Sequence, residues 1–290
     1  MNTHPAEAAP LAANMPFIHP WDKAAAGWNS HASAIHAWLA DATAAMLAAA
    51  RIGPGARVLD IAAGAGDQTL DIARCVGAHG HVLATDVSAA ILALARDNAR
   101  AADLNNIDTR VADAQALGLE GAGFDAAVSR LGLMFCEAPL QALREAHAAL
   151  KPGGRFSALV FSQPQHNPCL GVLMATALRH AGLPPRSAYA PGTLMSLGEP
   201  GLLARLLHTA GFVDIEMRTL DAPFRWPTSR DYVDFVRTSG TPIMEILAPL
   251  PLAAQRAAWD DMAAQLNVFD APTGWVGPNE LLLCAAAAPL

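Results

Sequence analysis

The chain has 290 residues, 53% of them hydrophobic, and its 26 Asp and Glu outnumber its 19 Lys and Arg, which gives a formal net charge of -7 at pH 7. A chain of this length can bury one large core and still carry a substantial insertion. The acidic balance argues against a broad contact with a phosphate backbone, so nucleic acid is not an expected partner.

The four cysteines are scattered along the chain, with no CxxC pair and no His at metal-ligand spacing. This pattern predicts no metal site and a reducing, cytoplasmic setting. The N-terminus lacks a basic segment followed by an apolar one, and the longest apolar run, residues 281–290, is about half the length of a bilayer span. A membrane segment is therefore not expected.

Residues 1–20 contain four prolines and no apolar periodicity, which predicts a flexible N-terminal arm. Residues 21–55 predict a helical segment, with a helix from about Ser30 to Arg51 whose apolar residues fall near one face. Trp21 and Trp28 precede that helix. They either pack between helices or cover a bound ligand, and the sequence leaves both interpretations open.

A strand, a loop of small residues and a helix follow one another at residues 58–74. The apolar run that starts at Val58 and closes on Asp60 predicts a short buried strand, and the small residues after it leave the backbone open to a ligand. Residues 68–74 have apolar positions at helical spacing, so the free N–H groups of that helix point at the same place. This unit is typical of a nucleotide-type site.

The spacing of the glycines indicates which class of nucleotide-type ligand the loop would bind. A dinucleotide fingerprint GxGxxG would need Gly at 62, 64 and 67, where the chain has Ala62, Gly64 and Asp67. Carboxylates at positions 60 and 67 suit a cationic ligand better than a pyrophosphate. The stretch resembles motif I of the class I S-adenosylmethionine-dependent methyltransferases, D-x-G-x-G-x-G, with Ala62 in place of the first glycine. The resemblance implies S-adenosylmethionine as the cofactor.

The next two strands end in acidic residues. The strand His81 to Asp86 places Asp86 twenty residues after Gly66, where a doubly wound sheet has its ribose-binding acid. Val87 is expected against the adenine, and Ser88 is expected to cap the helix that follows. After a strand at residues 107–111, Asp113 and Ala114 resemble the family's adenine-reading turn, in which a carboxylate and a backbone N–H contact the base.

A strand from Phe124 leads through Arg130 into a loop at the expected methionine end of the cofactor, and a helix follows at residues 138–150. Lys-Pro-Gly-Gly-Arg at 151–155 predicts a tight turn into the strand Phe156 to Phe161. These pieces resemble the branch that includes the ubiquinone and menaquinone biosynthesis C-methyltransferases and many small-molecule methyltransferases. The resemblance covers roughly residues 56–162, the expected cofactor-binding core.

Two segments interrupt the expected end of this fold, and both predict cover over a substrate. Residues 163–200 predict a lid insertion, and residues 221–278 predict a helical cap. Residues 201–220 and 279–290 are expected to complete the sheet. Tyr189, Arg225 and Trp226 are candidate substrate-binding residues. The competing interpretation is that such residues belong to a helical surface, where long side chains also cover apolar area.

Together these features predict an α/β protein with a Rossmann-like, doubly wound, seven-stranded sheet and helical cap insertions. The predicted function is in-line transfer of a methyl group from S-adenosylmethionine to a small organic acceptor at C, O or N. An aromatic or polyketide-like molecule is the expected acceptor. The residues expected at the cofactor are Trp28, Asp60, Ala62, Ala63, Gly64, Gly66, Asp86, Val87, Asp113, Ala114 and Arg130.

His166 is the candidate general base, because it follows the C-terminal end of the fifth strand on the acceptor side. A solvated loop histidine is the competing interpretation. Two other functions stay open: a nicotinamide-dependent oxidoreductase on a Rossmann fold, and a non-catalytic relative that keeps the cofactor. The sequence does not predict the oligomeric state.

Overall fold

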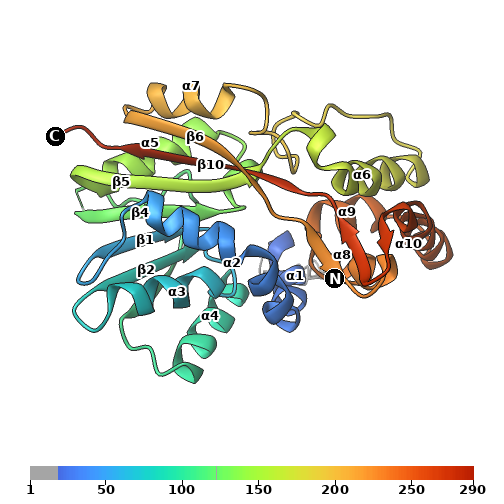
Figure 1. The fold of residues 1–290 in the computed structure, drawn as a ribbon, viewed down its shortest axis with the longest axis horizontal. Helices are drawn as coiled ribbons and strands as arrows, with labels where there is room; N and C mark the ends of the chain where they lie inside the picture. The colour runs from blue at the N-terminus through green and yellow to red at the C-terminus, as the bar shows by residue number, and fades with distance from the viewer. Residues whose placement is uncertain (1–18, 122) are drawn as a thin grey trace, which may run out of the picture.

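A seven-stranded sheet organises the computed structural model, which describes residues 19–121 and 123–290 (Figure 1). Its strand order is β3-β2-β1-β4-β5-β10-β6. The bounds are β1 Arg57–Ile61, β2 His81–Asp86, β3 Ile107–Val111, β4 Phe124–Arg130, β5 Leu150–Phe161, β6 Val213–Asp221 and β10 Glu280–Ala287. The predicted arm at residues 1–20 falls almost wholly outside the described residues, since only its last two residues are described.

Six strands of this sheet, β1 to β6, point the same way, and β10 inserts antiparallel between β5 and β6. In register, Leu281 of β10 lies opposite Phe161 on one side and Leu220 on the other. Residues 58–61 of β1 are fully buried, as expected for a parallel strand covered on both faces. The predicted Rossmann-like, seven-stranded fold is confirmed, and its carboxyl edge carries the end of β1, β2 and β4.

Helices cover both faces of the sheet, with α2, α3 and α4 on one face and α5 and α7 on the other (Figure 1). Their bounds are α2 Ala32–Ala49, α3 Asp67–Val76, α4 Ala89–Ala101, α5 Pro139–Ala149 and α7 Leu202–Thr209. Ser88 caps α4 as predicted, because its Oγ accepts a hydrogen bond from the N–H of Ile91 at 3.0 Å.

The remaining elements form a second lobe at the other end of the molecule (Figure 1). It contains α1 Pro20–Ser30, α6 Pro168–His180, α8 Ser229–Ser239, α9 Thr241–Leu247 and α10 Leu252–Leu266. It also contains a three-stranded antiparallel sheet, β7-β9-β8, formed by Phe224–Trp226, Gly274–Gly277 and Asp270–Ala271. The prediction for residues 221–278 included the helices but not this sheet, since strands of two to four residues carry no readable periodicity.

Two local predictions differ from the structure. Residues Pro20–Ser30 form a separate helix, α1, and the helical conformation is interrupted at His31 before α2 begins. Residues 151–154 form a bulge within β5 instead of a turn before it, because Leu150 pairs with Phe124 while Arg155 pairs with Ala126. In the part of the chain that the structure describes, 3₁₀ turns lie at Leu133–Phe135, Pro164–His166 and Asn267–Phe269.

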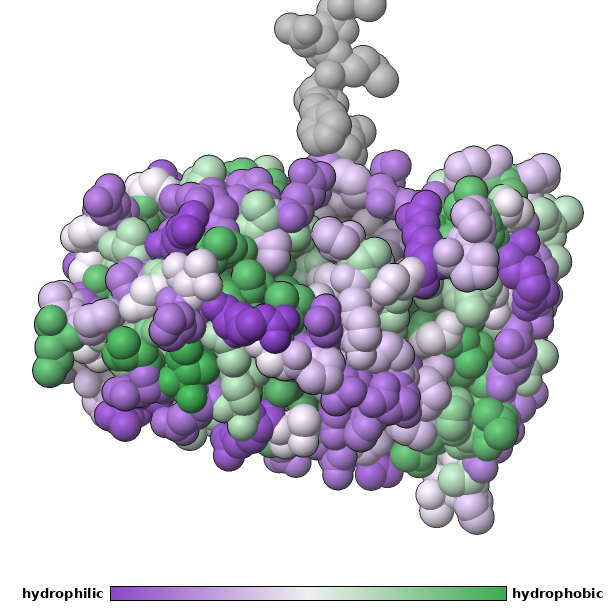
Figure 2. Space-filling view, turned by 90° about the horizontal axis from the view of Figure 1, so that it is seen from above, coloured by the Kyte–Doolittle hydropathy of each residue, from purple (hydrophilic) through white to green (hydrophobic). Residues whose placement is uncertain are grey.

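The surface mixes polar and apolar residues. Figure 2 shows hydrophilic and hydrophobic side chains interspersed over both lobes on the face that it presents. Among the described helices, none is both long and apolar enough to cross a lipid bilayer.

Candidate functional site

The loop after β1 has an unusual backbone. Ala62, Gly64 and Gly66 all adopt positive φ angles, of 57°, 59° and 89°. A Cβ atom built on Gly64 would meet nothing closer than a methyl of Ile91 at 3.9 Å, whereas one on Gly66 would lie 3.1 Å from the Cβ of Ala95 in α4. Gly64 is therefore required by backbone conformation and leaves open space beside the chain, while Gly66 also permits α4 to pack closely.

Ala62 occupies a left-handed conformation that glycine adopts without cost. Its side chain is accommodated by a second glycine distant in sequence: a Cβ on Gly132 would lie 2.3 Å from the Cβ of Ala62. The space between the two loops thus holds one methyl group. The departure from the methyltransferase motif at position 62 is matched by the absence of a side chain at position 132.

Asp60 is fully buried behind this loop. Its carboxylate accepts hydrogen bonds from Gln68 Nε2 at 3.1 Å and Thr69 Oγ1 at 2.6 Å, both in the first turn of α3. Desolvation raises the pKa of Asp60 to about 6, against the lowering effects of those two hydrogen bonds and of the Arg130 charge. The structure therefore places Asp60 where it ties the strand to the helix, with no surface for a ligand to touch.

Replacement of Asp60 by asparagine should change how stability depends on pH. An unfolded Asp has a pKa of about 3.9, so the raised pKa in the folded protein makes ionisation of Asp60 unfavourable to folding, by roughly 3 kcal/mol once complete. The wild-type contribution is fully favourable below pH ~4 and is lost as the pH rises through about 6. We expect the free energy of unfolding of Asp60→Asn, relative to wild type, to rise over this range in urea titrations. The exposed residue Asp41, changed to Asn, is the control, and equal pH profiles for the two variants would contradict the assignment.

Asp86 ends β2 beside the glycine loop. Its Oδ2 accepts from the N–H of Gly64 at 3.0 Å, and its Oδ1 accepts from the N–H of Ser88 at 3.0 Å. Burial raises the pKa of Asp86, while these hydrogen bonds lower it. The side chain is half-buried, and each carboxylate oxygen has a second lone pair, so Asp86 can still accept two hydroxyl groups. The two adjacent strand ends thus bring a carboxylate and an open backbone together.

Helix α1 lies against this edge of the sheet. Asp22 Oδ1 accepts a short hydrogen bond from Ser88 Oγ, and the ring of Trp21 packs edge-on against Phe135 with centroids 4.8 Å apart. Phe135 follows β4, where the methionine end of the cofactor is expected. Asp22 and Ser88 were not among the predicted site residues, and nothing local in the sequence announces their contact.

A second contact joins α1 to the glycine loop. Asn98 of α4 donates to the side chain of Asn29 at 3.0 Å and to the carbonyl of Ala65 at 2.9 Å. Trp28 faces the other way: its indole N–H donates to the carbonyl of Ser239 at 3.0 Å, and its ring meets Phe235. The structure therefore places Trp28 between α1 and α8, while Trp21 is the tryptophan nearer the loop after β4.

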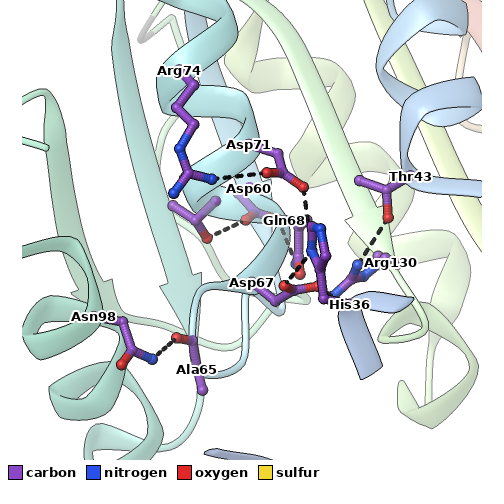
Figure 3. A network of polar contacts seen from close by, with 11 residues as sticks. His36, Thr43, Asp60, Ala65, Asp67, Gln68, Asp71, Arg74, Asn98 and Arg130 are labelled. Carbon is purple, nitrogen blue, oxygen red and sulfur yellow. Dashed lines mark hydrogen bonds and ion pairs between the residues drawn. The ribbon is translucent and has the colours of Figure 1, made fainter. Parts of the chain in front are cut away.

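Arg130 ends β4 and is buried in a polar network (Figure 3). Its guanidinium donates to Asp67 Oδ2 at 2.7 Å and to the hydroxyl of Thr43 at 2.8 Å. His36 contacts the other oxygen of Asp67 at 2.9 Å. The predicted residue Arg130 is thus held by α2 and α3, and its charge is compensated within the protein.

The other predicted cofactor residues follow the same edge. Ala63 is buried, and its N–H donates to the carbonyl of Thr85 at 2.9 Å. Asp113 is exposed, and its Oδ1 accepts from the backbone N–H of Gln115 at 2.8 Å, which fixes the turn. Val87 and Ala114 are partly exposed. Asp86 at the end of β2 and Asp113 just after β3 therefore both keep part of the side chain exposed to solvent.

His166 lies on the 3₁₀ turn after β5 and is about half exposed. Its Nδ1 is 3.2 Å from Glu280 Oε2, and Ser162 Oγ donates to the other oxygen of Glu280 at 2.6 Å. A carboxylate that holds one imidazole nitrogen leaves the other free to take a proton. The arrangement is compatible with a general base.

The three candidate substrate residues belong to two different segments. Trp226 lies in β7 and stacks on Phe235 with centroids 5.2 Å apart. Arg225 is exposed on the same strand, and Tyr189 is partly buried in the connection between α6 and α7. Within residues 19–121 and 123–290, no group of three His, Cys, Asp or Glu is placed to hold a metal ion.

Comparison with known proteins agrees with this geometry. Residues 58–154 match the sequence profile of the methyltransferase domain family. Over 115 residues the chain is 40% identical to the ubiquinone/menaquinone biosynthesis C-methyltransferase UbiE of Teredinibacter turnerae. The chain carries a class I methyltransferase domain.

The similarity to these relatives is confined to that domain. The matched stretch is 39% of this chain and 46% of the Teredinibacter protein, and 39% and 48% for a demethylmenaquinone methyltransferase of Listeria monocytogenes that is 33% identical over 114 residues. The chain spans about half the length of the curated relatives it matches. The methyltransferase domain therefore contains β1 to β4 and their helices, and the cap lies outside it.

Solved structures resemble a larger share of the chain. A putative methyltransferase from Bacillus halodurans has a TM-score of 0.58 at 18% identity, over 86% of this chain and 99% of that one. A phosphoethanolamine N-methyltransferase 2 from Haemonchus contortus, solved with S-adenosyl-L-methionine, has a TM-score of 0.56 at 16% identity, over 94% and 60%. The [4+2]-cyclase SpnF has a TM-score of 0.56 at 18% identity, over 96% and 100%. These identities show the fold alone, and the cyclase illustrates that one fold serves different reactions.

Proposed function

We propose that the protein transfers a methyl group from S-adenosylmethionine to a small organic molecule. The observation that carries this proposal is the contact between Asp86 and Gly64, whose carboxylate oxygen and N–H lie 3.0 Å apart. The Asp86 carboxylate thus lies beside an uncovered loop backbone at the carboxyl edge of the strands, which supports a ribose-binding role at the edge where doubly wound sheets bind nucleotides. The methyltransferase domain match supports the same conclusion.

The residues present fit this cofactor. The space beside Gly64 accepts a ligand against the main chain, and Asp86 retains acceptor capacity for the two ribose hydroxyls. Asp113 would accept from the adenine amino group, the N–H of Ala114 would donate to the ring, and Val87 would pack on the base. When bound, the cofactor supplies an electrophilic methyl group on a sulfonium.

The protein's own contribution is then orientation and exclusion of water. Trp21 and Phe135 form an aromatic pair at the expected methionine end, where aromatic faces attract a sulfonium cation. Asp60 and the Arg130–Asp67 pair hold the loop and α3 in position from behind. We propose positioning roles for Asp60 and Arg130, in place of direct contact with the cofactor.

The acceptor is proposed from the names of the relatives and from the segments outside the matched domain. The relatives named for ubiquinone and menaquinone C-methylation favour an activated aromatic carbon, with O- and N-methylation as alternatives. We propose that residues 56–162 bind the cofactor, while residues 163–200 and 221–278 determine the acceptor. His166, held by Glu280, is the proposed general base, and Tyr189, Arg225 and Trp226 remain proposed acceptor residues. The four free cysteines support the proposed cytoplasmic setting.

A thermal-shift comparison separates this function from an NAD-dependent one. A ligand at a hundred times its Kd stabilises the protein by about 2.7 kcal/mol, which corresponds to roughly 4–5 °C in Tm for a protein of this size. We expect S-adenosylmethionine and S-adenosylhomocysteine to raise the Tm by this amount and NAD to leave it within 1 °C (about 0.6 kcal/mol) of the free protein. A larger shift with NAD than with S-adenosylhomocysteine would favour an oxidoreductase.

A further inference from the structure

A cleft of about 420 Å³ opens between α1 and the helices α8, α9 and α10. Figure 1 shows α1 between the large sheet and these cap helices. The cleft is lined by polar and apolar side chains, among them Lys23, Arg237, Thr241, Leu252, Arg256 and Trp259. The volume is within the range of small-molecule sites, and none of its lining residues belongs to the proposed cofactor site.

The polar lining of the cleft is rich in cations. Lys23, Arg237 and Arg256 line the cleft with a single carboxylate, Glu245, in a protein whose net charge is -7. Arg237 also pairs with Asp234 at 3.2 Å. The side chains of Lys23 and Arg256 form no ion pair or hydrogen bond with any described residue. Two cationic groups are therefore available to a ligand, and a local positive potential favours an anion.

A buried hydroxyl also lacks a partner. Thr241 lines the cleft with 5% of its surface exposed, and its Oγ1 has no hydrogen-bond partner among residues 19–121 and 123–290. Burial of a hydroxyl without a partner is unfavourable, and most buried side-chain polar groups are paired. The Oγ1 atom has almost no accessible surface, so it lies beneath the wall of the cleft and is not itself a contact for a ligand.

Apart from Gln255, the rest of the lining is apolar. Met244, Leu247, Ala248 and Leu252 form it together with Trp259, and Leu252 is 70% exposed. Trp259 is almost wholly buried, so it provides a rigid aromatic wall. A ligand that fits this lining has a hydrophobic body as well as a charge.

We propose that this cleft binds an amphiphilic organic anion, a carboxylate with a hydrophobic chain or ring, at a site separate from the cofactor. The first turn of α1 divides the two sites. Pro20 and Lys23 line the cleft, whereas Trp21 and Asp22 contact residues beside the glycine loop. A ligand in the cleft therefore binds together with the cofactor, and the proposal does not depend on the methyltransferase activity.

Decanoate is the probe, titrated by calorimetry into the full chain with and without S-adenosylhomocysteine. We expect one bound decanoate per chain in both conditions, and at least tenfold weaker binding of the neutral analogue decanol. The double variant Lys23→Gln/Arg256→Gln should lower the decanoate affinity at least tenfold. Arg230→Gln removes an exposed cation from α8 outside the cleft and should leave the affinity within twofold.

Thr241→Val is a second control. It removes an unpaired buried hydroxyl that does not contact the ligand, without a change in shape, so the Tm should rise while the decanoate affinity stays within twofold of wild type. The proposal is overturned if decanoate does not bind, if decanol binds equally, or if S-adenosylhomocysteine displaces decanoate. It is also overturned if the double variant Lys23→Gln/Arg256→Gln binds decanoate as tightly as wild type.

Discussion

Asp86→Ala is expected to weaken S-adenosylmethionine binding more than a hundredfold. The change removes the proposed acceptor of two ribose hydroxyls, and charge-assisted hydrogen bonds contribute about 1.5–3 kcal/mol each, so the expected loss is about 3 kcal/mol or more. It also releases the N–H of Gly64, which Asp86 holds at 3.0 Å in the structure. Calorimetric titration of the cofactor measures the change directly.

The fold should survive this substitution. Burial raises the pKa of Asp86, which means that the protein holds its charged form at a cost, and removal of that charge offsets the lost hydrogen bonds. We therefore expect a small change in Tm. Asp97→Ala removes an exposed carboxylate on α4 that pairs only with Arg100 and should not affect cofactor binding. A cofactor Kd within twofold of wild type for Asp86→Ala would remove this residue from the site.

Gly132→Ala is expected to destabilise the protein by about 1–3 kcal/mol, the usual cost of an extra methyl in a closely packed site. The new Cβ would lie 2.3 Å from the Cβ of Ala62, and the rest of the surroundings are less crowded: Ser129 Oγ is 3.3 Å away and Ala62 Cα 3.7 Å. Gly132 has a φ of -109°, so alanine is not strained at that position. The cost therefore comes from one opposing methyl group.

Ala62→Gly should rescue Gly132→Ala. It removes the opposing methyl. It also removes the cost of holding an alanine in the left-handed conformation, about 1–2 kcal/mol, and the greater freedom of glycine in the unfolded chain partly cancels this gain in stability. In urea unfolding, we expect Ala62→Gly to be at least as stable as wild type and the double variant to be close to it. The coupling energy of the cycle should be about 1–3 kcal/mol. An equal cost of Gly132→Ala in both backgrounds would show that the two residues do not compete for space.

The cofactor domain was predictable because its signals are local. The glycine loop, Asp86 and the Ser88 cap are each read from a few consecutive residues whose conformation depends on their own side chains. Because parallel strands end at a common edge of the sheet, these residues were expected to lie together there. The family profile then confirmed a methyltransferase domain over residues 58–154.

The role of individual site residues was less predictable, because spacing does not reveal which way a side chain turns. Asp60 and Arg130 both belong to strands that end at the site, yet both side chains are buried in contacts with α2 and α3. Trp28 faces α8, and Trp226 belongs to a strand too short to show alternation. Each of these placements depends on a neighbour distant in sequence.

The sequence by itself determined the order of strands and helices in the methyltransferase domain, the loop of small residues after β1 and the acidic residues Asp86 and Asp113 at the ends of β2 and β3. Only the tertiary structure decided that Ala62 shares its space with Gly132, that α1 joins the site through Asp22 and Ser88, and that residues 224–226 pair with residues 275–277. The physical reason is range. Backbone propensity and capping act within a few residues, whereas packing and strand pairing join segments about 50 to 70 residues apart and are chosen by the free energy of the whole fold.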